Sequence, residues 1–320
     1  MKLNKSWGIA LIILACLSLV SAANHFFQPG QYLAREAQQL GEQFGHNMTQ
    51  FGQNMDQFGR NMDQVGNMID GLANGAGNLE DWYGADIATK QDTQQFPAAG
   101  VTQVSLDNQF GKVNITGDAN AKQITIKSTK RLHRMGSEEE MGRYFDDVVI
   151  ETEKQGGGEL SIRTQRPDAG NGFHPSMAVD YDIIVPPGVE LHLLNNVGEL
   201  TTTGMLSTVD AEVNVGKLDI NGYKGTLRLK NNTGEINARG GKNITNVDVE
   251  TNIGAINLYL PADANLQVDA ETNIGDLETQ FSELAIESHG PNKRIEDKLG
   301  DGQGTLHAHT NTGAIEIRKE

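Results

Sequence analysis

The chain has 320 residues, which is enough for one large domain or two small ones. Its 42 Asp and Glu residues outnumber its 26 Lys and Arg residues. The resulting net charge of −16 argues against a nucleic acid as partner, because phosphate backbones are bound by basic surfaces. The only cysteine, Cys16, excludes a disulfide framework and a cysteine-rich zinc site.

Residues 1–23 predict an export signal. Lys2 and Lys5 form a short basic start, and a nearly continuous apolar run follows from residue 7 to residue 20. Ser21-Ala22-Ala23 then offers small residues for cleavage. The remainder of the chain is therefore expected outside the cytoplasm, in the periplasm or at the cell surface.

Two alternatives to cleavage stay open for this leader. Residues 7–23 are at the short end of what spans a bilayer, so they could remain as a membrane anchor. Ile13-Leu14-Ala15-Cys16 resembles a bacterial lipobox, which would place a lipid on Cys16. Both alternatives also predict an exported protein.

Residues 24–98 predict an amphipathic helix followed by a flexible linker. A seven-residue repeat begins at Phe44, Phe51 and Phe58, and successive apolar residues are spaced alternately four and three residues apart. This pattern is typical of a helix with one apolar seam. Glycines and scarce charges make such a helix marginal alone, so it needs a partner surface. Self-association, packing on the following domain or a membrane tether would use Phe44, Met48, Phe51, Met55, Phe58 and Met62. Gly-rich and then Gln-rich residues 73–98 predict the linker.

In the part of the chain from about residue 99 onward, the motif Asn-x-Gly-x-(Leu/Ile) occurs six times, with its glycines 18, 18, 20, 21 and 38 residues apart. A period near 20 is typical of a solenoid. We therefore predict a mainly β domain over residues 99–320, a parallel β-solenoid similar to a β-helix with rungs of about 18–21 residues. The longest step indicates a rung without the motif or one with an insertion. The predicted structural corners are Asn196, Gly198, Asn214, Gly216, Asn232, Gly234, Asn252, Gly254, Asn273, Gly275, Asn311 and Gly313.

Each rung contains two short strands with alternating apolar and polar residues. The alternation directs one set of side chains into a thin core: Val209, Ala211, Val213, Leu218, Ile220, Leu227, Leu229, Ile236, Val247, Val249, Ile256, Leu258, Val268, Leu277, Ile315 and Ile317. Asn108-Gln109-Phe110-Gly111 is interpreted as a stretched early copy of the corner. Asparagines repeated at every rung are expected to stack as an amide ladder.

One short helix is expected to interrupt the β pattern. Ser137 and Glu140 form a capping box, and Met141 and Phe145 follow at helical spacing. We predict a helix over residues 137–147 that covers the first end of the solenoid. Residues 166–176 and 287–304 are predicted to be loops because they are rich in glycine and proline.

The alternation of Gly-x-(Leu/Ile)-x-(Leu/Ile) with Asn-x-Gly corners, after Val185-Pro186-Pro187-Gly188-Val189, resembles the bacterial putative-adhesin family. This family is a domain of unknown function on exported or membrane-tethered proteins. The resemblance covers roughly residues 100–320 and implies a β-solenoid on the outer side of a membrane. The heptad segment departs from the family's plan, and nothing transfers to it.

Few residues in the chain suggest chemistry. His307 and His309 lie two apart on a predicted strand and share a face, which makes them weak metal candidates without an evident third ligand. Outward carboxylates could line a groove for a cation or a sugar, although interspersed Lys and Arg favour a solubilising face: Asp210, Glu212, Asp219, Asp248 and Glu250. The corner asparagines are assigned to turn structure.

We therefore predict a non-catalytic, exported cell-envelope protein without a cofactor. In this interpretation an adhesin-like β-solenoid presents an acidic face to an envelope protein or a glycan. Two alternatives are a self-assembling envelope scaffold, in which solenoids stack end to end, and a polysaccharide-active enzyme on a β-helix.

Overall fold

The computed structural model describes residues 87–133, 137–165, 177–206 and 208–320. The predicted export signal, Cys16 and the Phe/Met heptads lie outside these residues, and so does the predicted loop 166–176. The described part is mainly β with one helix, as the sequence predicts. No helix within it is long and apolar enough to cross a membrane.

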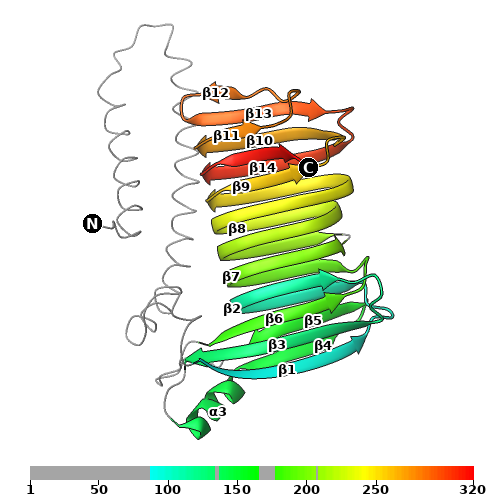
Figure 1. Ribbon diagram of the computed structural model, residues 1–320, viewed down its shortest axis with the longest axis vertical. Helices are drawn as coiled ribbons and strands as arrows, with labels where there is room; N and C mark the ends of the chain where they lie inside the picture. The colour runs from blue at the N-terminus through cyan, green and yellow to red at the C-terminus, as the bar shows by residue number, and fades with distance from the viewer. Residues whose placement is uncertain (1–86, 134–136, 166–176, 207) are drawn as a thin grey trace, which may run out of the picture. The chain divides into compact units, whose positions relative to one another are not determined.

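The strands form one open 15-stranded sheet whose main path begins at β1 and ends at β12 (Figure 1). The helix is α3 (Glu138–Asp147). The strands are β1 (Ile87–Pro97), β2 (Gln103–Gly117), β3 (Gln123–His133), β4 (Val149–Lys154), β5 (Glu159–Gln165), β6 (Ala178–Val185), β7 (Glu190–Leu206), β8 (Val209–Ile253), β9 (Ile256–Leu260), β10 (Leu266–Ile274), β11 (Leu277–Thr279), β12 (Glu287–His289), β13 (Asn292–Leu299), β14 (Gly304–Thr312) and β15 (Ile315–Lys319).

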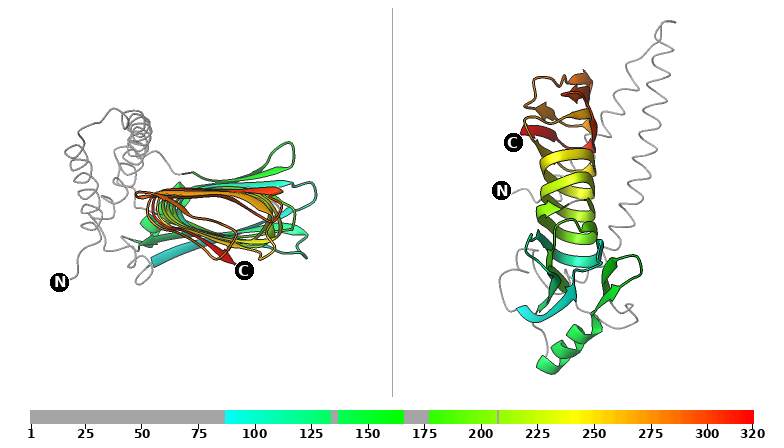
Figure 2. Two further views of the ribbon diagram at one scale, coloured as in Figure 1. Left: turned by 90° about the horizontal axis from the view of Figure 1, so that it is seen from above. Right: turned by 90° about the vertical axis from the view of Figure 1, so that its right-hand side faces the viewer.

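The central strands pair in parallel. β2 pairs with β7 and β7 pairs with β8, and this register places Gly111 beside Gly198 and Gly198 beside Gly216. Asn108-Gln109-Phe110-Gly111 is therefore an early corner, as predicted. Seen along the stack, the turns of β7 and β8 superimpose in a narrow oval (Figure 2). Every apolar side chain that the alternation directs inward is buried, which confirms the predicted core.

The C-terminal strands do not continue the stack in chain order. β14 pairs in parallel with β8 on one side and with β10 on the other, so the last rung lies between two earlier ones. The corner of Gly313 accordingly stacks between the corners of Gly254 and Gly275. The step of 38 residues between Gly275 and Gly313 therefore contains an insertion.

That insertion is a β-hairpin, and the predicted loop over residues 287–304 is wrong. β13 pairs antiparallel with β10 and β12 pairs antiparallel with β13, which forms the last edge of the sheet. Within β13 only Ile295 and Leu299 are buried. β13 lies next to the edge strand β12, and its few buried apolar residues do not show the alternation by which a strand is predicted from sequence.

The first end of the sheet is closed by antiparallel strands and by α3. β1 pairs with β3, and β3 pairs with β6. Residues 87–97 therefore form a strand, and their assignment to the flexible linker is wrong. The sequence of this strand is polar and lacks the alternation of apolar residues by which strands are predicted. Accordingly, Ala88 is the one residue of β1 that the structure describes as buried.

Helix α3 begins at the predicted capping box. The Ser137 side chain accepts a hydrogen bond from the backbone N–H of Glu140, and the Glu140 carboxylate accepts one from the backbone N–H of Ser137. The bond from the backbone N–H of Ser137, together with a second from the Ser137 hydroxyl to the same carboxylate, lowers the pKa of Glu140 by stabilising its charged form. Met141 and Phe145 are buried against the sheet, and α3 lies at the end formed by β1, β3, β4 and β5 (Figure 1).

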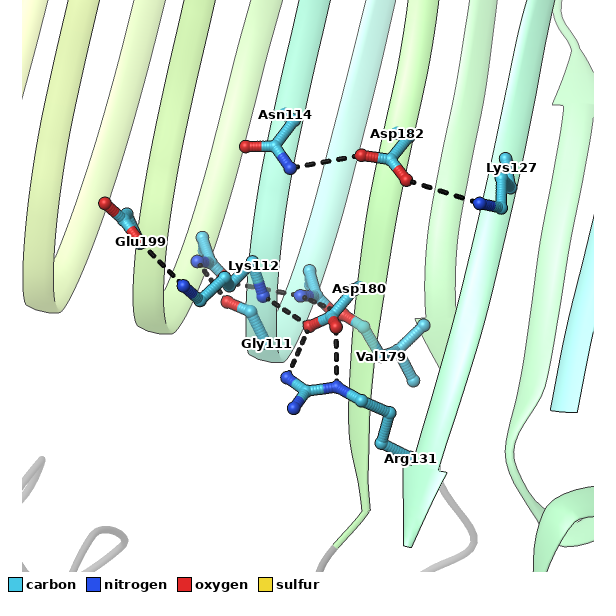
Figure 3. Close-up of polar contacts among 11 residues, drawn as sticks. Gly111, Lys112, Asn114, Lys127, Arg131, Val179, Asp180, Asp182 and Glu199 are labelled. Atoms are coloured by element: carbon cyan, nitrogen blue, oxygen red, sulfur yellow. Dashed lines mark hydrogen bonds and ion pairs between the residues drawn. The ribbon is translucent and has the colours of Figure 1, made fainter. Parts of the chain in front are cut away.

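Polar contacts mark the change from antiparallel to parallel pairing at β6 (Figure 3). Asp180 accepts hydrogen bonds from the backbone N–H of Lys112, at 2.8 Å, and from Arg131 Nη2, at 2.8 Å. Asp182 accepts from Asn114 Nδ2 at 3.1 Å. Asp180 thus links β6 to both of its neighbours, β2 and β3.

Two buried tyrosines are expected to make the domain sensitive to alkali. Burial raises the pKa of Tyr181 to about 12 and raises that of Tyr223 as well. An unfolded tyrosine titrates near pH 10, so this stabilisation is complete below about pH 10 and is lost as the pH rises toward 12. For Tyr181 alone the loss amounts to about 3 kcal/mol. Urea unfolding measured at several pH values up to 12 tests this expectation.

Variants identify the groups responsible for this pH dependence. Tyr181→Phe is expected to flatten the alkaline fall in the free energy of unfolding, whereas Tyr144→Phe, at a partly buried position, should leave it unchanged. Tyr181→Phe should also be less stable at neutral pH, because the Tyr181 hydroxyl lies 2.7 Å from Thr164 Oγ1. Equal stability of the wild type at pH 8 and pH 12 would contradict the prediction.

Candidate functional site

The predicted corner residues lie where each rung turns from its first strand to its second. At Gly234 φ is +143°, a conformation that other residues rarely adopt. A Cβ on Gly234 would lie 1.7 Å from the carbonyl oxygen of Gly216 in the rung beneath. The glycines therefore let successive corners stack directly on one another.

The motif asparagines lie on the outer side of these corners and bond to one another along the stack. The Nδ2 atom of one residue donates to the Oδ1 atom of a neighbouring one: Asn214 to Asn196 at 2.6 Å, Asn252 to Asn232 at 2.5 Å, Asn311 to Asn252 at 2.8 Å and Asn273 to Asn311 at 2.9 Å. The order of these bonds follows the spatial order of the rungs, with Asn311 between Asn252 and Asn273. The corner asparagines thus form an amide ladder.

A second polar row, which the sequence reading missed, lies on the inner side of the corners. The residue before each motif asparagine points inward, and in several rungs it is Asn or Thr. These side chains donate to corner carbonyls: Asn195 to Gly111 at 3.1 Å, Asn231 to Gly216 at 3.0 Å, Thr272 to Gly313 at 2.9 Å and Thr310 to Gly254 at 3.3 Å. Buried carbonyls need such donors, so both corner rows are structural.

The ionisable side chains that could bind a ligand lie together on the outer surface of three adjacent strands. The register of β8, β14 and β10 aligns Asp248 with His307 and Asp269, and it aligns Glu250 with His309 and Glu271. We call these six residues the histidine–carboxylate face. Each histidine therefore lies between two carboxylate-bearing residues of the neighbouring strands. The sequence alone did not reveal this arrangement, because β14 enters the stack out of chain order.

Within this face, Asp248, Glu250 and His307 converge most closely. One potential ligand atom from each residue lies within 4.8 Å of the others. Asp269 Oδ2 is 3.8 Å from His307 Nδ1 on the other side of the histidine. His309 lies apart from this group, with its Nε2 atom 3.3 Å from Asn311 Oδ1.

The other predicted carboxylates do not join this group. Asp210 Oδ2 lies 3.9 Å from His192 Nδ1, at the opposite end of β8. Glu212 lies beside Leu194 in the register of β7 and β8. Asp219 follows the Gly216 corner, and its Oδ2 atom lies 3.6 Å from Lys217 Nζ. The five predicted carboxylates therefore do not form one continuous groove.

Charges on the strands that follow the corners are compensated locally. Lys112, Glu199 and Lys217 are aligned by the register of β2, β7 and β8, and Lys112 Nζ is 3.1 Å from Glu199 Oε2. Such alternation of sign is typical of a solvated surface. The histidine–carboxylate face also carries cations, because Lys230 Nζ lies 3.8 Å from Glu250 Oε2 and Arg294 Nη2 lies 3.2 Å from Asp269 Oδ1. Among the described strands, however, only in this face do carboxylates of neighbouring strands alternate with histidines over three strands.

The profile of a family described as Toastrack DUF4097 matches residues 97–318. No curated protein matches the chain.

Several solved structures are similar to the chain. A putative cell adhesion protein from Clostridium sporogenes ATCC 15579 is 19% identical, with a TM-score of 0.41, over 73% of this chain and 100% of that one. A putative adhesin from Bacteroides fragilis NCTC 9343 is 10% identical, with a TM-score of 0.20, over 72% and 97%. A putative lipid binding protein from Parabacteroides distasonis ATCC 8503 is 11% identical, with a TM-score of 0.20, over 72% and 97%. At such identities the function has to be argued from the chain's own surface.

Proposed function

Since the chain belongs to the Toastrack DUF4097 family, as the resemblance in its sequence indicated, we propose that it is a non-catalytic, adhesin-like protein of the cell envelope. In this proposal a parallel β-solenoid with rungs of about 18–21 residues presents an acidic face to an envelope protein or glycan. The export signal predicted over residues 1–23 supports a location in the periplasm or at the cell surface. The Phe/Met stripe of residues 44–62 would tether or oligomerise the protein.

The observation that carries this proposal is the histidine–carboxylate face. Two of its carboxylates are accessible, as shown by side-chain exposures of 45% for Glu250 and 42% for Asp269. Residues that alternate with them, such as Val249 and Ala308, are fully buried, so the face stands on a packed core. Neighbouring strands repeat these groups about every 4.8 Å, which suits a partner with regularly spaced polar groups.

Binding to envelope fractions tests the proposed role. Labelled full-length protein is incubated with cell-wall glycan and, separately, with solubilised envelope proteins. The double variant Asp269→Asn/Glu271→Gln is expected to bind the recognised fraction at least ~10-fold more weakly, because it removes two carboxylates from the face.

Charge-matched variants serve as the control. Glu199→Gln/Glu235→Gln removes two carboxylates from strands that follow the corners, and binding should stay within about twofold of the wild type. Equal binding by both double variants and the wild type would overturn the proposed face. The fraction that retains the wild type identifies the partner as a glycan or a protein.

A further inference from the structure

Asp248, Glu250 and His307 form a cluster with the composition of a metal site. Asp248 and Glu250 lie on β8, and His307 lies on β14, which is the strand paired with it. The three potential ligand atoms, two carboxylate oxygens and one imidazole nitrogen, lie within 4.8 Å of one another. Three protein ligands with a fourth position open to solvent are typical of zinc sites that bind a further group.

Asp248 supplies an independent sign that a cation belongs here. Its Oδ1 atom is buried from solvent and has no hydrogen-bond partner among the described residues. A carboxylate oxygen that is withdrawn from water without a donor or cation is costly, and each such atom in a folded protein calls for an explanation. A metal ion held jointly with Glu250 and His307 would satisfy this oxygen.

The surroundings of the cluster favour a cation as well. Asp269 lies on the other strand beside β14, and its Oδ2 atom is 3.8 Å from His307 Nδ1. Carboxylates in this position orient metal-binding imidazoles. Two side-chain cations compete for these carboxylates: Lys230 Nζ is 3.8 Å from Glu250 Oε2, and Arg294 Nη2 is 3.2 Å from Asp269 Oδ1. Both pairs are exposed to solvent, and ion pairs of this kind are weak.

We propose that Asp248, Glu250 and His307 bind one divalent transition-metal cation, best matched by Zn²⁺. Mixed nitrogen and oxygen ligands suit zinc, whereas Ca²⁺ and Mg²⁺ prefer sites made of oxygen alone. The bound ion joins β8 to β14, and its open position points outward, where water or a donor group of a partner completes the coordination. This assignment does not depend on the proposed adhesive role, because it concerns the isolated protein.

Calorimetric titration of the metal-free full-length protein with zinc chloride tests the site. The wild type is expected to bind one zinc ion per chain that His307→Gln and Asp248→Asn bind at least ~10-fold more weakly. Calcium chloride should bind there far more weakly than zinc. Zinc should also raise the melting temperature of the wild type but not that of His307→Gln, since binding to the folded state alone stabilises it.

A second histidine on the same surface provides the matched control. His192 Nδ1 lies 3.9 Å from Asp210 Oδ2, with side-chain exposures of 42% for both, but no third ligand among the described residues joins this pair. His192→Gln should therefore bind zinc within about twofold of the wild type. Equal zinc affinity in the wild type and in His307→Gln would overturn the proposal, and so would equal loss in His192→Gln. Failure of the wild type to bind either envelope fraction, with zinc binding intact, would count against the proposed function alone.

Discussion

Replacing Gly234 with alanine is expected to lower the free energy of unfolding by about 4 kcal/mol. The new Cβ would lie 1.7 Å from the Gly216 carbonyl oxygen, far inside any contact distance, so two stacked rungs would have to separate. A further cost comes from φ of +143°, which strains any residue other than glycine. Strain and overpacking of this kind each cost about 1–3 kcal/mol, and together they approach the whole stability of a marginal domain. Urea denaturation followed by circular dichroism measures the change.

Gly142→Ala is the matched control for this substitution. Gly142 lies in α3, and a Cβ there would meet no atom within 4 Å. The alanine should therefore leave stability unchanged or raise it by about 0.5–1 kcal/mol, since alanine favours helices. A Gly234→Ala protein as stable as Gly142→Ala would show that the rungs are not in contact at their corners.

Removing β14 and β15 is expected to abolish the ordered C-terminal end of the stack. A chain that ends at residue 301 loses the strand that separates β8 from β10, and it loses the strand that pairs with β9 and β11. Leu306, Ile315 and Ile317 are almost completely buried, and burial of each is worth about 1.5–3 kcal/mol. Limited proteolysis should then cleave residues 256–301 rapidly while the region of β2 and β7 resists.

Two point variants test the same strand without shortening the chain. Leu306→Asp places a charge between Val247 and Val268 in the core, and it should destabilise the C-terminal end nearly as much as the truncation. Thr305→Asp changes the exposed neighbour on the same strand and should have a small effect. Similar protease resistance in both variants would contradict the interlocked arrangement of β14.

The sequence predicted what depends on local repetition. Alternation placed residues such as Val247 and Val249 inward, the capping box of Ser137 marked the start of α3, and the Asn-x-Gly phrase marked corners. Each of these signals is contained within a few residues, so pairing with distant strands does not alter it.

The sequence could not predict what depends on the spatial order of strands. β1 and β13 bury few apolar residues, so neither shows the alternation of an inner strand. Insertion of β14 between β8 and β10 brings His307 beside Asp248, although 59 residues separate them in the chain. The inward Asn195 and Asn231 have the composition of turn residues, and only the stack shows that they serve buried carbonyls.

The position of β14 in the sheet also determines when the C-terminal strands can finish folding. Until β14 has been synthesised and has docked, β8 and β10 each present an unpaired edge to a gap one strand wide. During synthesis these edges can pair prematurely with each other or with another nascent chain, because exposed strand edges act as templates. Folding of the strands from β8 to β14 is therefore expected to be completed only after β14 has been synthesised, and a chain that stalls before β14 would be prone to aggregate.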